Sequence, residues 1–254
     1  MTTVIGNYQQ VQERIATACE RAGRPVDAVT LLAVSKTFPA EAVREAFAAG
    51  ARQFGENYVQ EALDKIATLA DIRRQLQWHL IGPLQSNKTR PVAEAFDWVH
   101  SVDRLKIAQR LAEQRPPTLG PLQLCLQVNI SGEASKSGLA PADTAALALA
   151  VAALPAERVR LRGLMAIPEP AGDLDAQRAP HRALRELMAA VNAALAQAGS
   201  STRLDTLSMG MSADLEAAIA EGATLVRVGT AIFGGRPPLA RTEPSPCKWG
   251  SSGG

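Results

Sequence analysis

Lys36 lies in the segment 31–38 (LLAVSKTF), at the end of a short apolar run that has the length and composition of a buried strand. A lysine that loses hydration at such a place has a lowered pKa, so a neutral amine becomes available for Schiff-base chemistry with an aldehyde. The alternative is that its aliphatic chain simply reaches from the strand end to water. No other lysine ends a comparable run; the others are Lys65, Lys88, Lys106, Lys136 and Lys248.

Two segments near the end of the chain have the composition of a phosphate-binding site, 208–214 (SMGMSAD) and 228–231 (VGTA). Gly210 and Gly229 permit a close approach of the backbone to a ligand, and Ser212 is expected to cap the following helix and to offer a hydroxyl. The N–H groups at the start of that helix favour an anion. Either segment alone could be an ordinary turn, but together they fall at the ends of the last two predicted strands, which favours a phosphate site.

Arg227 lies two residues before Gly229 and should therefore share its side of the strand. A guanidinium in that place needs a partner. The residue alone favours a carboxylate inside the fold, and the alternative is a ring nitrogen of a bound cofactor.

The remaining polar candidates carry weaker signals. His79 is interpreted either as a ring that lines the site or, as the residue alone favours, as a satisfied core histidine. His100 and Ser101 have no acid nearby in the sequence that would complete a nucleophilic triad, and His181 lies among polar neighbours in a predicted helix. Lys136 lies on a glycine-bounded loop and is expected to be solvated, with a second holding site for a ligand as the alternative.

A regular alternation of strand and helix patterns positions these residues. An amphipathic helix leads the chain, and eight strand patterns follow it, each but the last before a helix. The predicted strands are 29–36, 52–56, 77–82, 97–102, 122–130, 159–167, 206–210 and 225–233. The predicted helices are 5–22, 39–49, 58–70, 87–96, 103–114, 141–154, 176–195 and 213–221.

Uniform alternation with short connections requires parallel strands. Eight such units in 254 residues fit the α/β class as a single (β/α)8 TIM barrel with an extra N-terminal helix better than an open doubly wound sheet. A glycine-rich dinucleotide fingerprint is missing after the first strand, where residues 35–37 (SKT) occupy the turn. We therefore predict one barrel over residues 1–236 and a Pro/Gly/Ser-rich tail over 237–254, which is expected to be disordered.

Composition narrows the class of partner and the compartment. With 46% apolar and 20% charged residues and a net charge of +2, the chain is predicted to be a soluble protein with a small-molecule site, without nucleic acid or a membrane as partner. Cys19, Cys125 and Cys247 are far apart and outside any CxxC spacing, so neither a disulfide framework nor a metal site is expected. No targeting or membrane-spanning pattern is present, and we predict a cytoplasmic monomer.

Five motifs in order make the chain resemble the pyridoxal phosphate homeostasis protein family, whose barrel is like the N-terminal domain of alanine racemase. They are 33–37 (AVSKT), 54–61 (FGENYVQE), 78–88 (WHLIGPLQSNK), 207–214 (LSMGMSAD) and 226–234 (VRVGTAIFG). The resemblance spans about residues 4–236, nearly the whole chain, and it implies a fold-type III protein that binds pyridoxal 5′-phosphate (PLP).

The resemblance also implies roles for single residues. Lys36 would carry PLP as a lysine aldimine, and Arg227 would face the pyridine nitrogen. Ser212, Gly229 and Thr230, with the backbone of Met211, would hold the phosphate, while Asn57 and His79 would line the ring.

A carrier is preferred to an enzyme for two reasons. An arginine opposite the pyridine nitrogen makes the cofactor a poorer electron sink. Alanine racemase takes a tyrosine base from a second domain, whereas this chain ends soon after the eighth strand and its tyrosines are Tyr8 and Tyr58. We therefore predict reversible PLP binding, buffering of the aldehyde and supply to PLP-dependent apo-enzymes by transient contact. The alternative is a single-domain fold-type III PLP enzyme, such as a low-activity amino-acid racemase.

Overall fold

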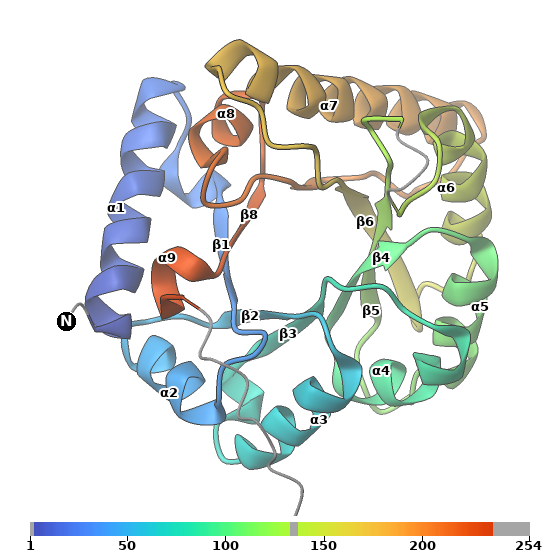
Figure 1. The fold of residues 1–254 in the computed structure, drawn as a ribbon. Helices are drawn as coiled ribbons and strands as arrows, with labels where there is room; N and C mark the ends of the chain where they lie inside the picture. The colour runs from blue at the N-terminus through green and yellow to red at the C-terminus, as the bar shows by residue number, and fades with distance from the viewer. Residues whose placement is uncertain (1–2, 133–136, 236–254) are drawn as a thin grey trace, which may run out of the picture.

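Eight parallel strands pair in chain order, and the last pairs with the first, so that the sheet closes into a barrel (Figure 1). The computed structural model describes residues 3–132 and 137–235. The strands are Thr30–Val34 (β1), Gln53–Glu56 (β2), Gln77–Leu80 (β3), Trp98–Val102 (β4), Leu122–Gln127 (β5), Val159–Met165 (β6), Thr206–Ser208 (β7) and Leu225–Val228 (β8). The predicted (β/α)8 barrel is therefore confirmed.

Helices surround the barrel as an outer ring (Figure 1). They are Val4–Arg21 (α1), Ala40–Ala48 (α2), Val59–Thr68 (α3), Thr89–Ala95 (α4), Leu105–Gln114 (α5), Thr144–Ala152 (α6), Leu174–Gln197 (α7), Leu215–Ala220 (α8) and Thr230–Phe233 (α9). Short 3-10 turns lie at Val26–Ala28, Arg73–Gln75, Ser86–Lys88 and Pro141–Asp143. Because the strands are covered on both faces, most of their residues are apolar and buried, as parallel sheets require.

The leading helix α1 completes the ring where the helix after β8 is short. It packs against α2, α8 and α9, with Tyr8, Val11 and Ile15 on its buried face. Thr3 caps its first turn by accepting a hydrogen bond from the Gly6 N–H at 3.1 Å. The Asn7 amide donates to the Ile232 carbonyl at 2.9 Å, which joins α1 to α9. The predicted N-terminal helix thus has a structural role in closing the outer layer.

The predicted eighth strand, residues 225–233, is wrong in its second half. β8 ends at Val228, and residues 230–233 form the one-turn helix α9. Gly229 separates the two, with backbone angles of φ −115° and ψ −74° that leave the strand conformation. Its place is close-packed, since a Cβ atom there would lie 3.1 Å from the Val34 carbonyl oxygen. The predicted tail, 237–254, and Lys136 lie outside the described residues.

Pairing of β1 with β8 brings the two motif-bearing ends of the chain together. Leu32 lies opposite Arg227 and Ala33 opposite Val228, so the residues that follow β1 and β8 emerge side by side. β7 joins β8 through Ser208 and Leu225. Lysine, arginine and the proposed phosphate segments therefore share one end of the barrel.

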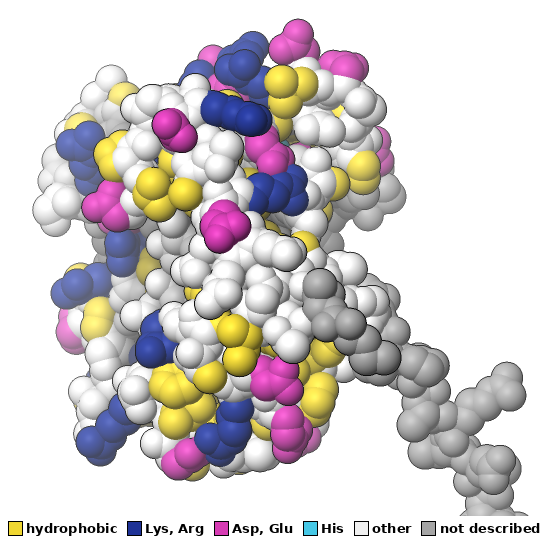
Figure 2. Space-filling view, turned by 90° about the vertical axis from the view of Figure 1, so that its left-hand side faces the viewer, with side chains coloured by type: hydrophobic (Ala, Val, Ile, Leu, Met, Phe, Trp, Pro, Cys, Tyr) yellow, Lys and Arg dark blue, Asp and Glu magenta, His cyan; other side chains and the backbone are white. Residues whose placement is uncertain are grey.

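One face of the outer surface is mixed in charge. On the face in Figure 2, Lys and Arg side chains alternate with Asp and Glu, and no broad area of one sign is visible. Within the described residues, no helix combines the length and the apolar character that crossing a membrane needs.

Candidate functional site

A cavity of about 340 Å³ opens at the carboxyl ends of the strands, the end at which barrel proteins place their sites. It contains seven of the eight residues predicted as a cofactor site, all but His79. The lining residues are Val34, Lys36, Thr37, Phe38, Asn57, Ile81, Ile167, Met211, Ser212, Ala213, Arg227, Gly229, Thr230 and Gly234. Residues from the first two strands and the last two strands thus meet in one place.

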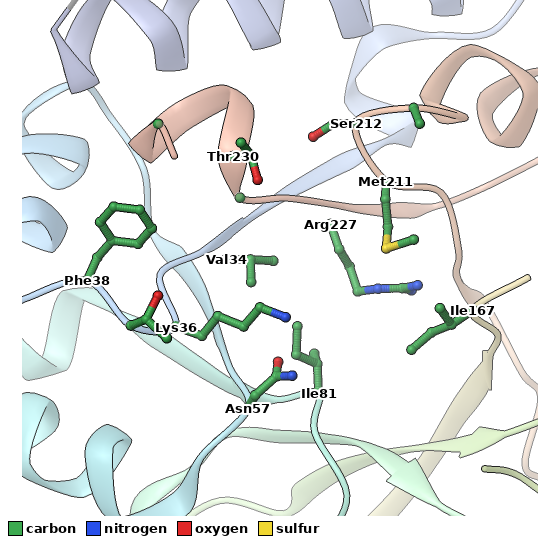
Figure 3. Close-up of a pocket in the computed structure, with 14 residues that line it drawn as sticks. Val34, Lys36, Phe38, Asn57, Ile81, Ile167, Met211, Ser212, Arg227 and Thr230 are labelled. Atoms are coloured by element: carbon green, nitrogen blue, oxygen red, sulfur yellow. The ribbon is translucent and has the colours of Figure 1, made fainter. Parts of the chain in front are cut away.

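The polar ends in the cavity come from different sides (Figure 3). The Lys36 side chain extends into the cavity with its amine directed toward the Arg227 side. The hydroxyl ends of Ser212 and Thr230 point inward from the loop after β7 and the start of α9. Neither hydroxyl has a hydrogen-bond partner within the described residues, so both remain available to a ligand.

Arg227 is held by neutral acceptors. Its Nη1 donates to Ser208 Oγ at 2.8 Å and its Nη2 to the Ala166 carbonyl at 2.9 Å, and the residue is only 4% exposed. Burial lowers the pKa of this guanidinium to about 10. It forms no ion pair with a carboxylate among the described residues, so the partner favoured from the residue alone is not found.

His79 lies behind this arginine rather than in the cavity. Its Nδ1 is 2.9 Å from His100 Nε2, and His100 Nδ1 is 2.8 Å from Ser208 Oγ. Its ring also stacks on Trp98, with centroids 5.4 Å apart. His79 is thus a buried histidine that bonds through Nδ1, and its contact with the site runs through His100, Ser208 and Arg227.

His79 and His100 are both neutral. Burial lowers the pKa of His79 to about 3, and burial, together with the charges of His79 and Arg227, lowers the pKa of His100 well below its ordinary value. Ser208 accepts from Arg227, so its own proton serves His100, and His100 then donates from Nε2 to His79. The last N–H, on His79 Nε2, has no partner within the described residues.

The loop between β7 and α8 is held by the Asp214 carboxylate rather than by a Ser212 cap. Asp214 Oδ1 accepts a hydrogen bond from the Met211 N–H at 2.7 Å, and Asp214 Oδ2 lies 2.9 Å from His181 Nε2. Burial raises the pKa of Asp214, but the bonds from His181 and Met211 outweigh it, and the pKa lies below its ordinary value. The prediction that Ser212 caps the helix is wrong, because α8 begins at Leu215, after Asp214.

This arrangement changes the expected contribution of Met211. Its backbone N–H, predicted to hold phosphate, already serves Asp214, while its side chain lines the cavity. Gly210 is required for the tight turn before it, with φ of +90° and a Cβ atom that would lie 2.4 Å from the Ala218 Cβ. The N–H groups of Ser212 and Ala213 have no acceptor within the described residues, so both are available to an anion.

Sequence reasoning missed the apolar and supporting parts of the site. Val34, Phe38, Ile81 and Ile167 line the cavity, but an apolar side chain at a strand end has no chemical signature of its own. His100 has no acid nearby in the sequence, and its partners are a serine 108 residues away and another histidine. Contacts between distant strands decide these roles, and a single sequence does not display them.

Comparison with known proteins gives a consistent family. Residues 6–237 match the profile described as alanine racemase, N-terminal domain. The pyridoxal phosphate homeostasis protein of Pseudomonas aeruginosa is 63% identical over 236 residues, which is 93% of this chain and 97% of that protein. The protein of that name from Escherichia coli is 54% identical over 240 residues, with 93% and 98% covered.

Solved structures agree. PipY of Synechococcus elongatus, in a structure with PLP bound, is 43% identical, covers 88% of this chain and 100% of that chain, and has a TM-score of 0.74. Alanine racemase of Clostridium difficile is 12% identical and covers 90% of this chain but 57% of that one, with a TM-score of 0.65, a likeness in fold.

Proposed function

The chain belongs to the pyridoxal phosphate homeostasis protein family, and from that premise we propose that it binds PLP reversibly through Lys36 and serves the intracellular homeostasis of this cofactor. The observation that carries the proposal is the meeting of Lys36, Arg227, Ser212 and Thr230 in one cavity (Figure 3).

The chemistry of the ligand matches the placement of these groups. PLP supplies an aldehyde that condenses reversibly with a primary amine and releases water, opposite a ring nitrogen and beside a phosphate arm. In the cavity an amine, a guanidinium and a pair of hydroxyls come from three different sides. The two hydroxyls without intramolecular partners and the unused N–H groups of Ser212 and Ala213 fit a phosphate.

Each protein group would then have one task. Lys36 provides the attached amine, and Arg227 donates a proton to the ring nitrogen without giving it up, because a guanidinium with a pKa of about 10 stays charged near neutral pH. Ser212 and Thr230 donate to phosphate oxygens. Ile81 and Ile167 offer apolar contact to a planar ring.

We infer that the protein is a carrier rather than a catalyst. Among the described lining residues, the ionisable side chains are Lys36 and Arg227, and no Asp, Glu, His, Cys or Tyr lines the cavity. Proton transfer on both faces of an amino-acid substrate would need a second group of suitable pKa. A low-activity racemase is the alternative, and the experiment below separates the two.

Supply of the cofactor to PLP-dependent apo-enzymes would follow from reversible attachment. We propose that it occurs by transient contact at the open end of the barrel, where Lys36 is half-buried and Ile167 is exposed. A reducing cytoplasm is the proposed compartment, since Cys19 and Cys125 are buried free thiols.

The test combines spectroscopy with trapping. Purified protein mixed with PLP should develop a visible absorbance band, and borohydride reduction followed by peptide mass spectrometry should place the pyridoxyl group on Lys36. Lys36→Ala should lose both signals yet still bind pyridoxine 5′-phosphate, which lacks the aldehyde. Lys106→Ala, at an exposed position on α5, is the matched control and should behave as wild type. A pyridoxyl group on another lysine would overturn the assignment.

A second measurement addresses catalysis. Amino acids incubated in heavy water with the PLP-loaded protein should keep their α-hydrogen. Rapid exchange, lost in Lys36→Ala, would replace the carrier proposal with the racemase alternative.

A further inference from the structure

A cluster of charged side chains contacts the backbone on both sides of Lys36 without lining the cavity. Lys65, on α3, donates from Nζ to Glu56 Oε1 at 2.6 Å, to Glu61 Oε1 at 3.1 Å and to the Ser35 carbonyl at 2.8 Å. Ser35 Oγ donates to the same Glu56 oxygen at 2.6 Å. None of Ser35, Glu56, Glu61 and Lys65 touches the cavity, so the proposed function above uses none of them.

This cluster holds both peptide groups that flank Lys36. The carbonyl of Ser35, on the N-terminal side, accepts from Lys65. The N–H of Thr37, on the C-terminal side, donates to Glu61 Oε1 at 2.6 Å. Because Glu61 and Lys65 are themselves paired, a single ion pair at positions i and i+4 of α3 fixes the chain before and after the lysine.

The backbone at this point needs such support. Thr37 has φ of +67° and is the non-glycine residue with a left-handed conformation in the described part of the chain. That conformation brings Cβ close to a carbonyl oxygen and is disfavoured for a branched residue. Strained residues of this kind persist where surrounding contacts over-determine them, and they cluster at functional sites.

The cluster is also expensive to bury. Glu56 is fully buried and Lys65 is 5% exposed. Burial raises the pKa of Glu56 even though Lys65 and Ser35 both stabilise its carboxylate, and Glu56 Oε2 has no partner within the described residues. An ion pair in such a place contributes little net stability compared with apolar residues, which points to a positional role.

We propose that Glu61 and Lys65 are positioning residues for Lys36: they hold the Ser35 and Thr37 peptide groups so that the lysine side chain enters the cavity. The proposal rests on the proposed function, because it concerns the amine that binds the aldehyde. Glu61 is the residue to change, since its side chain is 32% exposed and Glu56 still pairs with Lys65 when it is removed.

The experiment compares two ligands in four proteins. The Kd for PLP depends both on the fit to the cavity and on attachment to Lys36. Pyridoxine 5′-phosphate has no aldehyde, so its Kd depends on the fit to the cavity alone. The proteins are wild type, Glu61→Ala, Glu61→Gln and Asp64→Ala. Asp64 lies on α3, and its carboxylate accepts from the Gln60 amide at 3.1 Å without contacting the backbone beside Lys36 in the described part of the chain, so its variant is the matched control. Urea unfolding establishes that each variant is folded.

Glu61→Ala is expected to raise the Kd for PLP about tenfold, the effect of losing one hydrogen bond to a charged acceptor, and to leave the Kd for pyridoxine 5′-phosphate unchanged. Glu61→Gln keeps an oxygen that accepts from Thr37, so its Kd for PLP should stay within about threefold of wild type. Asp64→Ala should match wild type with both ligands.

The proposal is overturned if Glu61→Ala binds PLP as wild type does, if both ligands weaken together, or if Glu61→Gln falls as far as Glu61→Ala. Failure of wild type to attach PLP at Lys36 is a different result. It would remove the proposed function itself, whatever the Glu61 variants do.

Discussion

Two buried polar networks support the two cations of the cavity, and they do so by opposite means. Below Lys36, the network is ionic and acts on the backbone: Glu56, Lys65 and Glu61 hold the neighbouring peptide groups. Behind Arg227, the network is neutral and acts on the side chain: Ser208 accepts from the guanidinium, with His100 and His79 beyond it.

The difference follows from what each cation has to do. In the proposed function the Lys36 amine forms and breaks a covalent bond, and the contacts of the ionic network hold the peptide groups beside it. A guanidinium that only donates hydrogen bonds is best fixed at its head. Neutral acceptors do this without offsetting its charge, which stays directed at the cavity.

The largest effect is expected from breaking the ionic network. Lys65→Met keeps the volume of the side chain but leaves the buried Glu56 carboxylate without its cation. Removal of one partner from a buried pair costs about 3–5 kcal/mol, which a urea titration at pH 7 would measure as a lower free energy of unfolding.

Two further variants sharpen this result. In the double variant Glu56→Gln with Lys65→Met no buried charge remains unpaired, so it should be more stable than Lys65→Met alone. Arg44→Met breaks the exposed pair with Asp71 and should change stability far less. Equal losses for Lys65→Met and Arg44→Met would contradict the special status of the buried pair.

The next effect is a dependence on pH with opposite signs in the two networks. His79 has a folded pKa of about 3 against an ordinary value of 6.5, so its contribution to stability is fully present above pH 6.5 and is lost as the pH falls toward 3. Glu56 has a raised folded pKa, so its contribution is present below its ordinary value of 4.5 and is lost as the pH rises through the folded pKa.

Urea unfolding between pH 4 and pH 6.5 would separate these signs. His79→Asn keeps an acceptor for His100 but does not titrate. The free energy of unfolding of this variant should therefore rise with pH less steeply than that of wild type, and the two slopes should differ by about 1.4 kcal/mol per pH unit for one proton. Glu56→Gln should make the rise steeper. Parallel pH profiles for wild type and His79→Asn would show that His79 is not held neutral.

A smaller effect is expected at the cavity from Ser208→Ala. This change removes the hydroxyl that accepts from Arg227 and leaves the Ala166 carbonyl as the acceptor of its side chain. Since the proposed function directs Arg227 at the ring rather than at the aldehyde, the Kd should rise about tenfold for PLP and for pyridoxine 5′-phosphate alike. Ser201→Ala, at an exposed position, is the control. Weakening of PLP alone would mean that Ser208 supports Lys36 instead.

Sequence reasoning reached the barrel and most of the cavity for identifiable reasons. Strand and helix periodicities are local, and the closure of eight units places the ends of β1, β7 and β8 together, so Lys36, Ser212 and Thr230 could be grouped in advance. The supporting networks depend on contacts that no local pattern shows. The resemblance predicts His79 at the ring, and its hydrogen bond to His100 is a contact that the sequence does not display.

The Glu61–Lys65 pair gives a weaker signal in the sequence. Its spacing of i and i+4 fits an ordinary exposed helix pair, and only the packing of α3 against the end of β1 shows that Lys65 is buried. The short helix α9 was missed for a related reason, because residues 230–233 are as apolar as a strand and Gly229 alone marks the break.

The smallest effect is expected at Thr37, which follows Lys36. It tests whether the backbone at this turn is strained. A left-handed conformation costs an L-residue about 1–2 kcal/mol, and glycine removes that cost but loses about 0.5–1 kcal/mol of backbone entropy on folding. Thr37→Ala keeps the strain and Thr37→Gly relieves it, while both remove the same hydroxyl. Thr37→Gly should therefore be the more stable by about 1 kcal/mol in urea unfolding. In a Glu61→Ala background the gap should narrow, because the N–H of residue 37 has then lost its acceptor and the alanine variant can leave the left-handed conformation. A glycine variant no more stable than the alanine variant would mean that the turn after Lys36 is not strained. The ionic network would then not be holding a strained backbone there.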